Sequence, residues 1–118
     1  MFFPYIKIPE KEYINKIKAM GAIIFFDVDG TLYKTVGKAD INVKHLLEVF
    51  NSAFCTVFAW SGGGDKYAYQ IIKQLGLTDY FLGYFSKIEP LPFEPDITID
   101  DDDYTAKGKL NLKIIGSR

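Results

Sequence analysis

Cysteine and histidine are almost absent from this 118-residue chain, which contains only Cys55 and His45. A structural zinc site takes about four such ligands, so this class of site is excluded. A single thiol also excludes a disulfide within the chain, which fits a reducing compartment. We interpret Cys55, in a run of β-forming residues, as a core residue and His45 as a surface residue.

The sequence also lacks an excess of either charge and any long apolar run. Its 14 basic and 15 acidic residues give a formal net charge of −1, so nothing attracts the whole molecule to nucleic acid or anionic lipid. We therefore consider nucleic acid only as a candidate substrate and not as a binding partner. The apolar run at 21–26 is far too short to cross a membrane, and the N-terminus shows no secretory signal. We expect a cytoplasmic protein without a membrane partner.

What the chain does have is enough apolar surface for one core. Hydrophobic residues make up 48% of it and charged residues 25%, as in ordinary soluble proteins. The length is that of one compact domain, so we predict a single domain over 1–118. Residues 1–20 are expected to form an extended lead-in and a helix, and residues 22–103 carry the motifs.

Apolar runs and helical repeats alternate along the chain. Runs of β-forming residues predict five strands, at 22–26, 54–60, 80–85, 97–99 and 110–115, the last at a sheet edge. Apolar residues three and four positions apart predict helices at 43–50 and 66–75, capped by Asp40 and Asp65. This alternation favours an α/β fold: a single Rossmann-like domain with a mainly parallel sheet of about five strands flanked by helices.

The sequence DVDGTL at 27–32 follows directly on the apolar run AIIFF. Extended residues two apart point to the same side, so Asp27 and Asp29 flank one reacting centre, and Gly30 lets the chain turn away. A carboxylate nucleophile takes a phosphoryl group as an acyl phosphate, and a second, protonated carboxyl gives its proton to the leaving alcohol. An acidic turn is the simpler interpretation, but the whole pattern favours catalysis.

Two further segments offer groups that bind phosphate. SGGG at 61–64 precedes a predicted helix, so the Ser61 hydroxyl and backbone N–H groups such as that of Gly62 form an anion site. Taken alone, the segment fits a flexible glycine turn equally well. Lys87 follows the short strand at 80–85 and is placed to hold a nucleophile and phosphoryl oxygens by charge, although most lysines are surface residues.

Six acids and no base lie in the segment 94–103. Mg²⁺ prefers oxygen ligands and commonly takes one or two carboxylates together with water and phosphate. Asp100 ends a predicted strand and is the acid best placed to share an ion with Asp27, and Asp101 is a further candidate. The two acids that follow are interpreted as solvated loop residues.

These four segments, in this order, resemble the motifs of the haloacid dehalogenase (HAD) superfamily. DVDGTL is similar to its first motif, Ser61 in FAWSGG to the second, Lys87 to the third, and Asp100 with Asp101 in ITIDDD to the fourth. The resemblance spans residues 22–103. The second acid of the first motif, Asp29, is similar to the phosphatases and phosphotransferases of this superfamily, because its dehalogenase members lack that acid.

The resemblance implies a Mg²⁺-dependent phosphatase in which Asp27 attacks phosphorus and Asp29 protonates the leaving oxygen. It implies that Asp27, Asp100 and the backbone carbonyl of Asp29 hold the Mg²⁺ ion. It also implies four residues that position the nucleophile and the phosphoryl group: Thr31, Ser61, Gly62 and Lys87.

The spacing of the motifs bears on the shape of the site. Only 31 residues separate Asp29 from Ser61, and 25 separate Ser61 from Lys87. A turn and a helix occupy each interval, which leaves no room for an inserted cap domain. We therefore expect an open site that admits either a small phosphorylated molecule or the phosphorylated end of a macromolecule.

Two other classes of protein fit parts of the pattern. A receiver-like phosphoacceptor domain has about this length and also uses aspartate and Mg²⁺. In such a domain the phosphorylated aspartate lies at the end of a later strand, where this chain has Trp60 and Ser61. A non-catalytic module that binds metal or phosphate is the second alternative. None of the four motif segments lacks the acidic, hydroxyl or basic residue that catalysis needs. This favours an enzyme over a non-catalytic module.

Overall fold

The structure, a computed structural model, describes residues 21–35, 37–101 and 108–113. The lead-in and helix expected at 1–20 lie outside the described residues, as do the two acids at 102 and 103.

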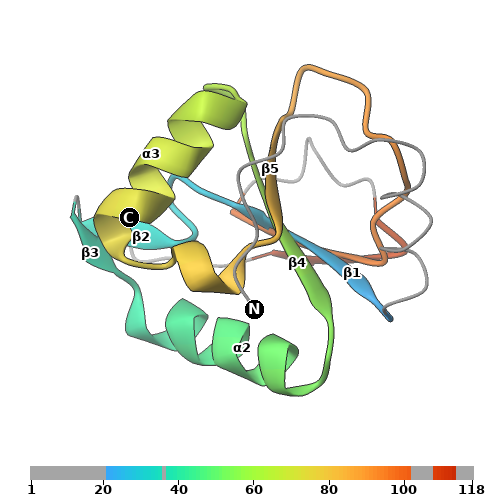
Figure 1. Cartoon of the computed structure of the whole chain (residues 1–118), viewed down its shortest axis with the longest axis horizontal. Coiled ribbons are helices and arrows are strands. Elements are labelled where there is room, and N and C mark those ends of the chain that lie inside the picture. Colours follow the sequence, from blue (N-terminus) through green and yellow to red (C-terminus); the bar gives the residue numbers. More distant parts are fainter. Residues whose placement is uncertain (1–20, 36, 102–107, 114–118) are drawn as a thin grey trace.

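Five parallel strands form the central sheet, in the order β5-β4-β1-β6-β7 (Figure 1). Their bounds are β1 Ile23–Asp27, β4 Thr56–Ser61, β5 Gly83–Ser86, β6 Ile97–Asp100 and β7 Leu110–Lys113. The predicted α/β fold, with its parallel five-stranded sheet and edge strand near the C-terminus, is confirmed. The strand expected from residue 54 begins two residues later, because Phe54 adopts a left-handed backbone (φ 59°) that cannot continue a strand.

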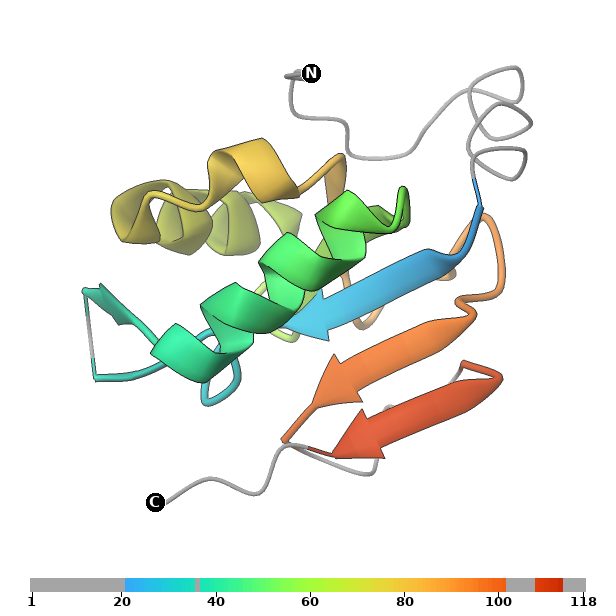
Figure 2. The same cartoon turned by 90° about the horizontal axis from the view of Figure 1, so that it is seen from below.

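Helices α2 (Ile41–Ser52) and α3 (Asp65–Leu75) pack on the same face of this sheet (Figure 2). The core on that face consists of apolar side chains from both helices and from four strands, among them Ile24, Leu47 and Ile72, all 0% exposed. Neither described helix is long and apolar enough to cross a membrane.

The two predicted helix caps differ in outcome. Asp40 is the N-cap of α2, where its side chain accepts from the backbone N–H groups of Asn42 and Val43. The prediction for Asp65 was wrong: Gly64 is the N-cap of α3 and Asp65 is its first residue. Gly64 has φ 103°, a conformation that favours glycine and places the helix start one residue earlier than a side-chain cap would.

Aromatic rings form the core on the opposite face. Phe25 lies at the centre, with ring centroids 5.3 Å from Phe58 and Trp60, 5.5 Å from Phe85 and 6.0 Å from Phe93. Phe93 belongs to the connection between β5 and β6, which therefore covers this face without a helix. Each such ring pair adds about 0.5–1.5 kcal/mol beyond burial, so the strands are held firmly from both sides.

A two-stranded hairpin, β2 (Tyr33–Thr35) and β3 (Lys38–Ala39), follows β1 and was not predicted. Its strands are too short to show a periodic pattern, and Tyr33 pairs with Ala39 in antiparallel register. Between β1 and β5 the described residues form this hairpin, the two helices, strand β4 and a 3₁₀ turn (Thr78–Tyr80), with no inserted cap domain.

Candidate functional site

The carboxyl ends of four neighbouring strands carry predicted site residues to one edge of the sheet. Figure 2 shows two of these strands, β1 in blue and β6 in orange, side by side and pointing the same way. Asp27 ends β1, Ser61 ends β4, Asp100 ends β6, and Lys87 follows the last residue of β5. Because all these strands run in the same direction, residues far apart in the sequence meet at this edge.

Lys87 lies between the carboxylates of Asp27 and Asp100. Its Nζ donates to Asp27 Oδ1 at 2.8 Å and to Asp100 Oδ2 at 2.7 Å. All three side chains are largely buried, with exposed fractions of 13% for Lys87, 8% for Asp27 and 7% for Asp100. Lys87 Nζ also lies 5.6 Å from the centroid of the Trp60 ring, a cation–π contact that sequence reasoning missed.

Burial and charge act in opposite directions on these groups. Burial raises the pKa of the Asp27 carboxyl, and the charge of Asp100 adds to this, while the hydrogen bond from Lys87 offsets only part of it. Burial alone would lower the pKa of Lys87, but its hydrogen bonds to Asp100 and Asp27 outweigh burial and raise it. The ammonium therefore keeps its charge between the two acids.

Thr31 orients the other oxygen of Asp27. The turn after β1 is closed by backbone bonds from Thr31 and Leu32 to the carbonyl of Val28, and Gly30 within it has φ 78°. This turn brings the fully buried Thr31 hydroxyl to donate to Asp27 Oδ2 at 3.0 Å. Both oxygens of Asp27 thus have donors, which fixes the orientation of the carboxylate.

Asp29 lies past the strand end, on the surface, and its partners are two tyrosines. The hydroxyl of Tyr33, in β2, and that of Tyr67, in α3 at 2.7 Å, both donate to Asp29 Oδ1. Sequence reasoning missed both tyrosines. Tyr33 stands four residues after Asp29 in the chain, whereas nothing in the sequence places Tyr67 beside it.

The glycine segment after β4 wraps around Ser61. The Ser61 hydroxyl accepts from the backbone N–H of Gly63 at 3.0 Å. The backbone carbonyl of Ser61 accepts from the backbone N–H groups of Gly64 at 3.2 Å and Lys87 at 3.0 Å. A side chain at Gly62 would have open space around it. The segment at the start of α3 is therefore an ordered turn with Gly62 on its exposed side.

Three carboxylates lie close enough to share one cation. An oxygen from each of Asp27, Asp100 and Asp101 lies within 4.8 Å of the other two. Among the described residues, the carboxylate of Asp29 does not belong to this cluster of three. An all-oxygen donor set of this kind fits a hard cation such as Mg²⁺, which keeps several of its sites for water and phosphate.

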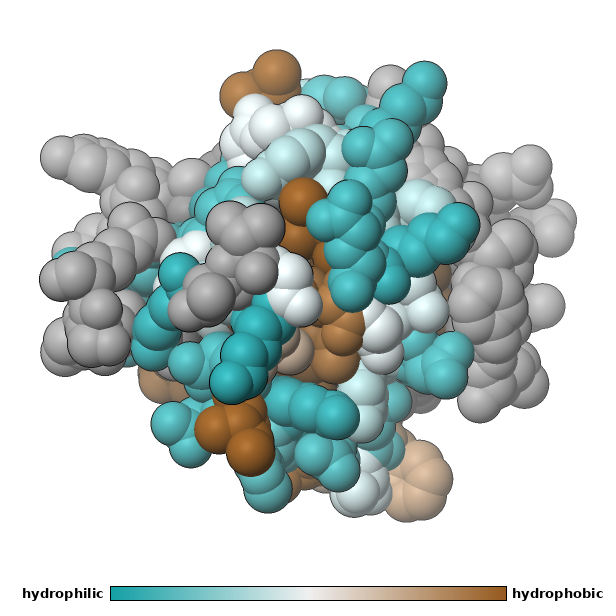
Figure 3. Space-filling model, turned by 90° about the vertical axis from the view of Figure 1, so that its left-hand side faces the viewer, coloured by the Kyte–Doolittle hydropathy of each residue, from teal (hydrophilic) through white to brown (hydrophobic). Residues whose placement is uncertain are grey.

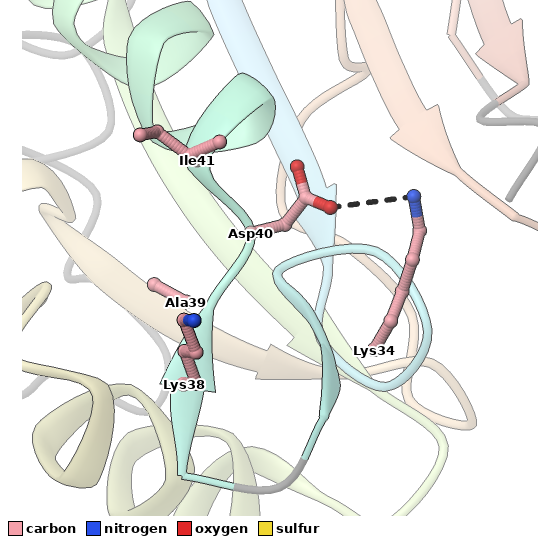
Figure 4. A pocket seen from close by; sticks show the side chains of 5 residues that line it. All are labelled: Lys34, Lys38, Ala39, Asp40 and Ile41. Atoms are coloured by element: carbon pink, nitrogen blue, oxygen red, sulfur yellow. Dashed lines mark ion pairs between the residues drawn. The ribbon is translucent and has the colours of Figure 1, made fainter. Parts of the chain in front are cut away.

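The surface at this edge is mostly hydrophilic. Figure 3 views the molecule from the side to which the strands point, and polar residues surround a narrow apolar strip there. A hollow of about 290 Å³ between the hairpin and α2 is lined by Lys34, Lys38, Ala39, Asp40 and Ile41 (Figure 4). The predicted site residues do not line this hollow.

Comparisons with models of protein families, with curated proteins and with solved structures found no match for this chain.

Proposed function

We propose that the protein is a Mg²⁺-dependent phosphomonoester hydrolase of the haloacid dehalogenase type, with Asp27 as its nucleophile. The observation that carries the proposal is the buried group of Asp27, Lys87 and Asp100, in which one ammonium bridges two carboxylates at the carboxyl edge of a parallel sheet. The mostly hydrophilic surface on the side to which the strands point suits a phosphorylated substrate (Figure 3).

The first step is transfer of the phosphoryl group to the protein. A carboxylate oxygen of Asp27 attacks phosphorus, the bond from phosphorus to the ester oxygen breaks, and a protonated Asp29 gives its proton to the leaving oxygen. The products of this step are an alcohol and an aspartyl phosphate. Thr31 and Lys87 hold the attacking carboxylate so that it meets the substrate in one orientation.

The second step regenerates the enzyme. Asp29, now ionised, takes a proton from a water molecule, whose oxygen attacks phosphorus and releases Asp27 and inorganic phosphate. Lys87, Ser61 and the backbone N–H of Gly62 are the groups that would stabilise the phosphoryl oxygens in both steps. The Ser61 oxygen accepts from the N–H of Gly63, and its own hydroxyl proton would be donated to a phosphoryl oxygen.

Asp27, Asp100 and Asp101 would hold the Mg²⁺ ion, with the backbone carbonyl of Asp29 as a further ligand. When bound, Mg²⁺ supplies positive charge that offsets repulsion between the substrate phosphate and the carboxylates. We also propose a reducing, cytoplasmic compartment, which the single thiol of the chain fits.

The test is a screen for phosphate release with Mg²⁺ and with excess chelator. The panel contains an aryl phosphate, sugar phosphates, nucleotides and oligonucleotides phosphorylated at either end. We expect turnover of at least one class with Mg²⁺, a loss of more than about a thousandfold in Asp27→Asn, and no turnover with chelator. Glu48→Gln, an exposed change on α2, is the matched control and should keep full activity.

Two results would contradict the proposal. Equal turnover by wild type and Asp27→Asn would remove Asp27 as nucleophile. Phosphate transfer to Asp27 that stops at a persistent acyl phosphate would instead identify a phosphoacceptor domain.

A further inference from the structure

Asp29 links two parts of the fold at this edge of the sheet, the β2–β3 hairpin and α3. Tyr33 comes from the hairpin and Tyr67 from the first turn of α3, and their hydroxyls meet on the same oxygen, Asp29 Oδ1. The other oxygen, Oδ2, is outside both bonds. Hydrogen bonds to Asp29 raise the pKa of both tyrosines, so each hydroxyl keeps its proton as a donor.

The glycine segment makes room for this arrangement. A Cβ at Gly63 would lie 2.8 Å from Cδ2 and 3.1 Å from Cγ of the Tyr67 ring, and at 2.8 Å either the ring or the backbone would have to shift. A Cβ at Gly62 would meet nothing within 4 Å. The middle glycine of the three is thus the one that leaves room for the Tyr67 ring beside the backbone, where its hydroxyl reaches Asp29.

We propose that Tyr33 and Tyr67 form a clamp that holds the Asp29 carboxyl in one orientation and fastens the β2–β3 hairpin to α3. Both tyrosines are positioning residues that act through Asp29. Their two donors occupy Oδ1, which leaves Oδ2 as the oxygen that exchanges a proton with the substrate. What the oriented carboxyl does rests on the proposed function, whereas the clamp itself does not.

A positioned acid matters most for esters whose leaving group is a strong base. An alkoxide needs its proton as the bond to phosphorus breaks, whereas a nitrophenolate leaves readily without one. Loss of the clamp should therefore slow alkyl phosphates far more than p-nitrophenyl phosphate. A general structural defect would slow both classes equally.

The first measurement is hydrogen exchange of the backbone amides of residues 31–40, which needs no activity. Tyr67→Phe removes a hydroxyl on α3, yet we expect it to speed exchange in the hairpin about fivefold, the factor that one ordinary hydrogen bond provides. Tyr33→Phe should do the same. Tyr80→Phe, a hydroxyl deletion in the 3₁₀ turn at the opposite edge of the sheet, is the control and should leave exchange unchanged.

The second measurement compares steady-state kinetics on an alkyl phosphate and on p-nitrophenyl phosphate. In both clamp variants we expect kcat for the alkyl ester to fall about tenfold or more, kcat for the aryl ester to fall less than about threefold, and KM to stay nearly constant.

The outcomes separate this inference from the proposed function. Wild-type exchange rates in Tyr33→Phe and Tyr67→Phe would overturn the clamp whether or not the protein is an enzyme. Equal losses on both esters would overturn the positioning role of the tyrosines. A wild-type protein without activity on any ester would refute the proposed function, while faster hairpin exchange in Tyr67→Phe would still establish the clamp.

Discussion

The Lys87 ammonium offsets the negative charge of two buried carboxylates, those of Asp27 and Asp100. Asp27 and Asp100 both lie beneath the surface with exposed fractions below a tenth, and each carboxylate is costly to bury without a counter-charge. The ammonium lies within 3 Å of both, as its distances of 2.8 and 2.7 Å show. One residue therefore serves the stability of the fold and, in the proposed function, the charge balance of the site.

Replacing Lys87 should be severely destabilising. Lys87→Met keeps the length of the side chain but removes the ammonium that bridges two buried acids, and we expect the free energy of unfolding at neutral pH to fall by about 3–5 kcal/mol. Urea unfolding in the absence of divalent cations measures this. Lys44→Met, an exposed change on α2, should shift the value by less than about 0.5 kcal/mol. A Lys87→Met protein as stable as this control would show that the acids do not depend on the lysine.

At the scale of single residues, the sequence indicated the acids and missed their neighbours. Asp27 and Asp100 could be predicted because each directly follows an apolar run, and strand ends in a parallel sheet share one edge. Tyr33 and Trp60 could not, because a tyrosine near a turn or a tryptophan in a buried strand carries no mark of the side chain it will meet. The contact of Tyr67 with Asp29 depends on how α3 packs, which no local pattern encodes.

At the scale of elements, the chain fixes where α2 begins through one side chain. Asp40 Oδ1 accepts from the N–H groups of Asn42 at 3.0 Å and Val43 at 3.1 Å, and Oδ2 lies 3.3 Å from Lys34 Nζ. Partial burial raises the pKa of this carboxyl, but the bonds from Val43 and Lys34 outweigh burial and the pKa lies below its ordinary value. The folded state therefore favours ionised Asp40.

The cap gives a prediction with a defined pH dependence. Asp40→Ala should lower the free energy of unfolding by about 1 kcal/mol, whereas Asp40→Asn, which keeps a cap acceptor, should lose less. A carboxyl whose pKa is lower in the folded state adds its full contribution to the free energy of unfolding above its ordinary pKa of 3.8. That contribution is lost as the pH falls through the folded-state pKa. Unfolding curves from pH 5 to pH 2 should therefore converge for wild type and Asp40→Asn. Curves that stay parallel would contradict the assignment.

Regular elements were predictable where their patterns were long enough. Each strand of the sheet corresponds to an apolar run, and both described helices to a repeat of apolar residues. The β2–β3 hairpin was missed because strands of two and three residues carry no period. The cap of α3 was misplaced because an acid before a helical repeat looks the same whether it precedes the helix or opens it.

At the scale of the whole molecule, the sheet order explains how a short chain assembles a site. The order β5-β4-β1-β6-β7 places β1 between β4 and β6, so Asp27 lies between the ends that carry Ser61 and Asp100. Lys87 reaches the same point from the neighbour of β4. The hairpin and the helices fill the connections from β1 to β4 and from β4 to β5. The described residues therefore include no separate domain over this edge.

The most direct test of the central claim is to trap the phosphorylated residue. Wild type is quenched during turnover of the best ester from the screen with Mg²⁺, and borohydride then reduces any acyl phosphate to an alcohol, which converts the aspartate to homoserine. Peptide mass spectrometry locates the change. We predict homoserine at position 27, dependent on both ester and Mg²⁺ and absent from Asp27→Asn. Phosphate release with an unmodified Asp27, or with homoserine at another aspartate, would contradict the account.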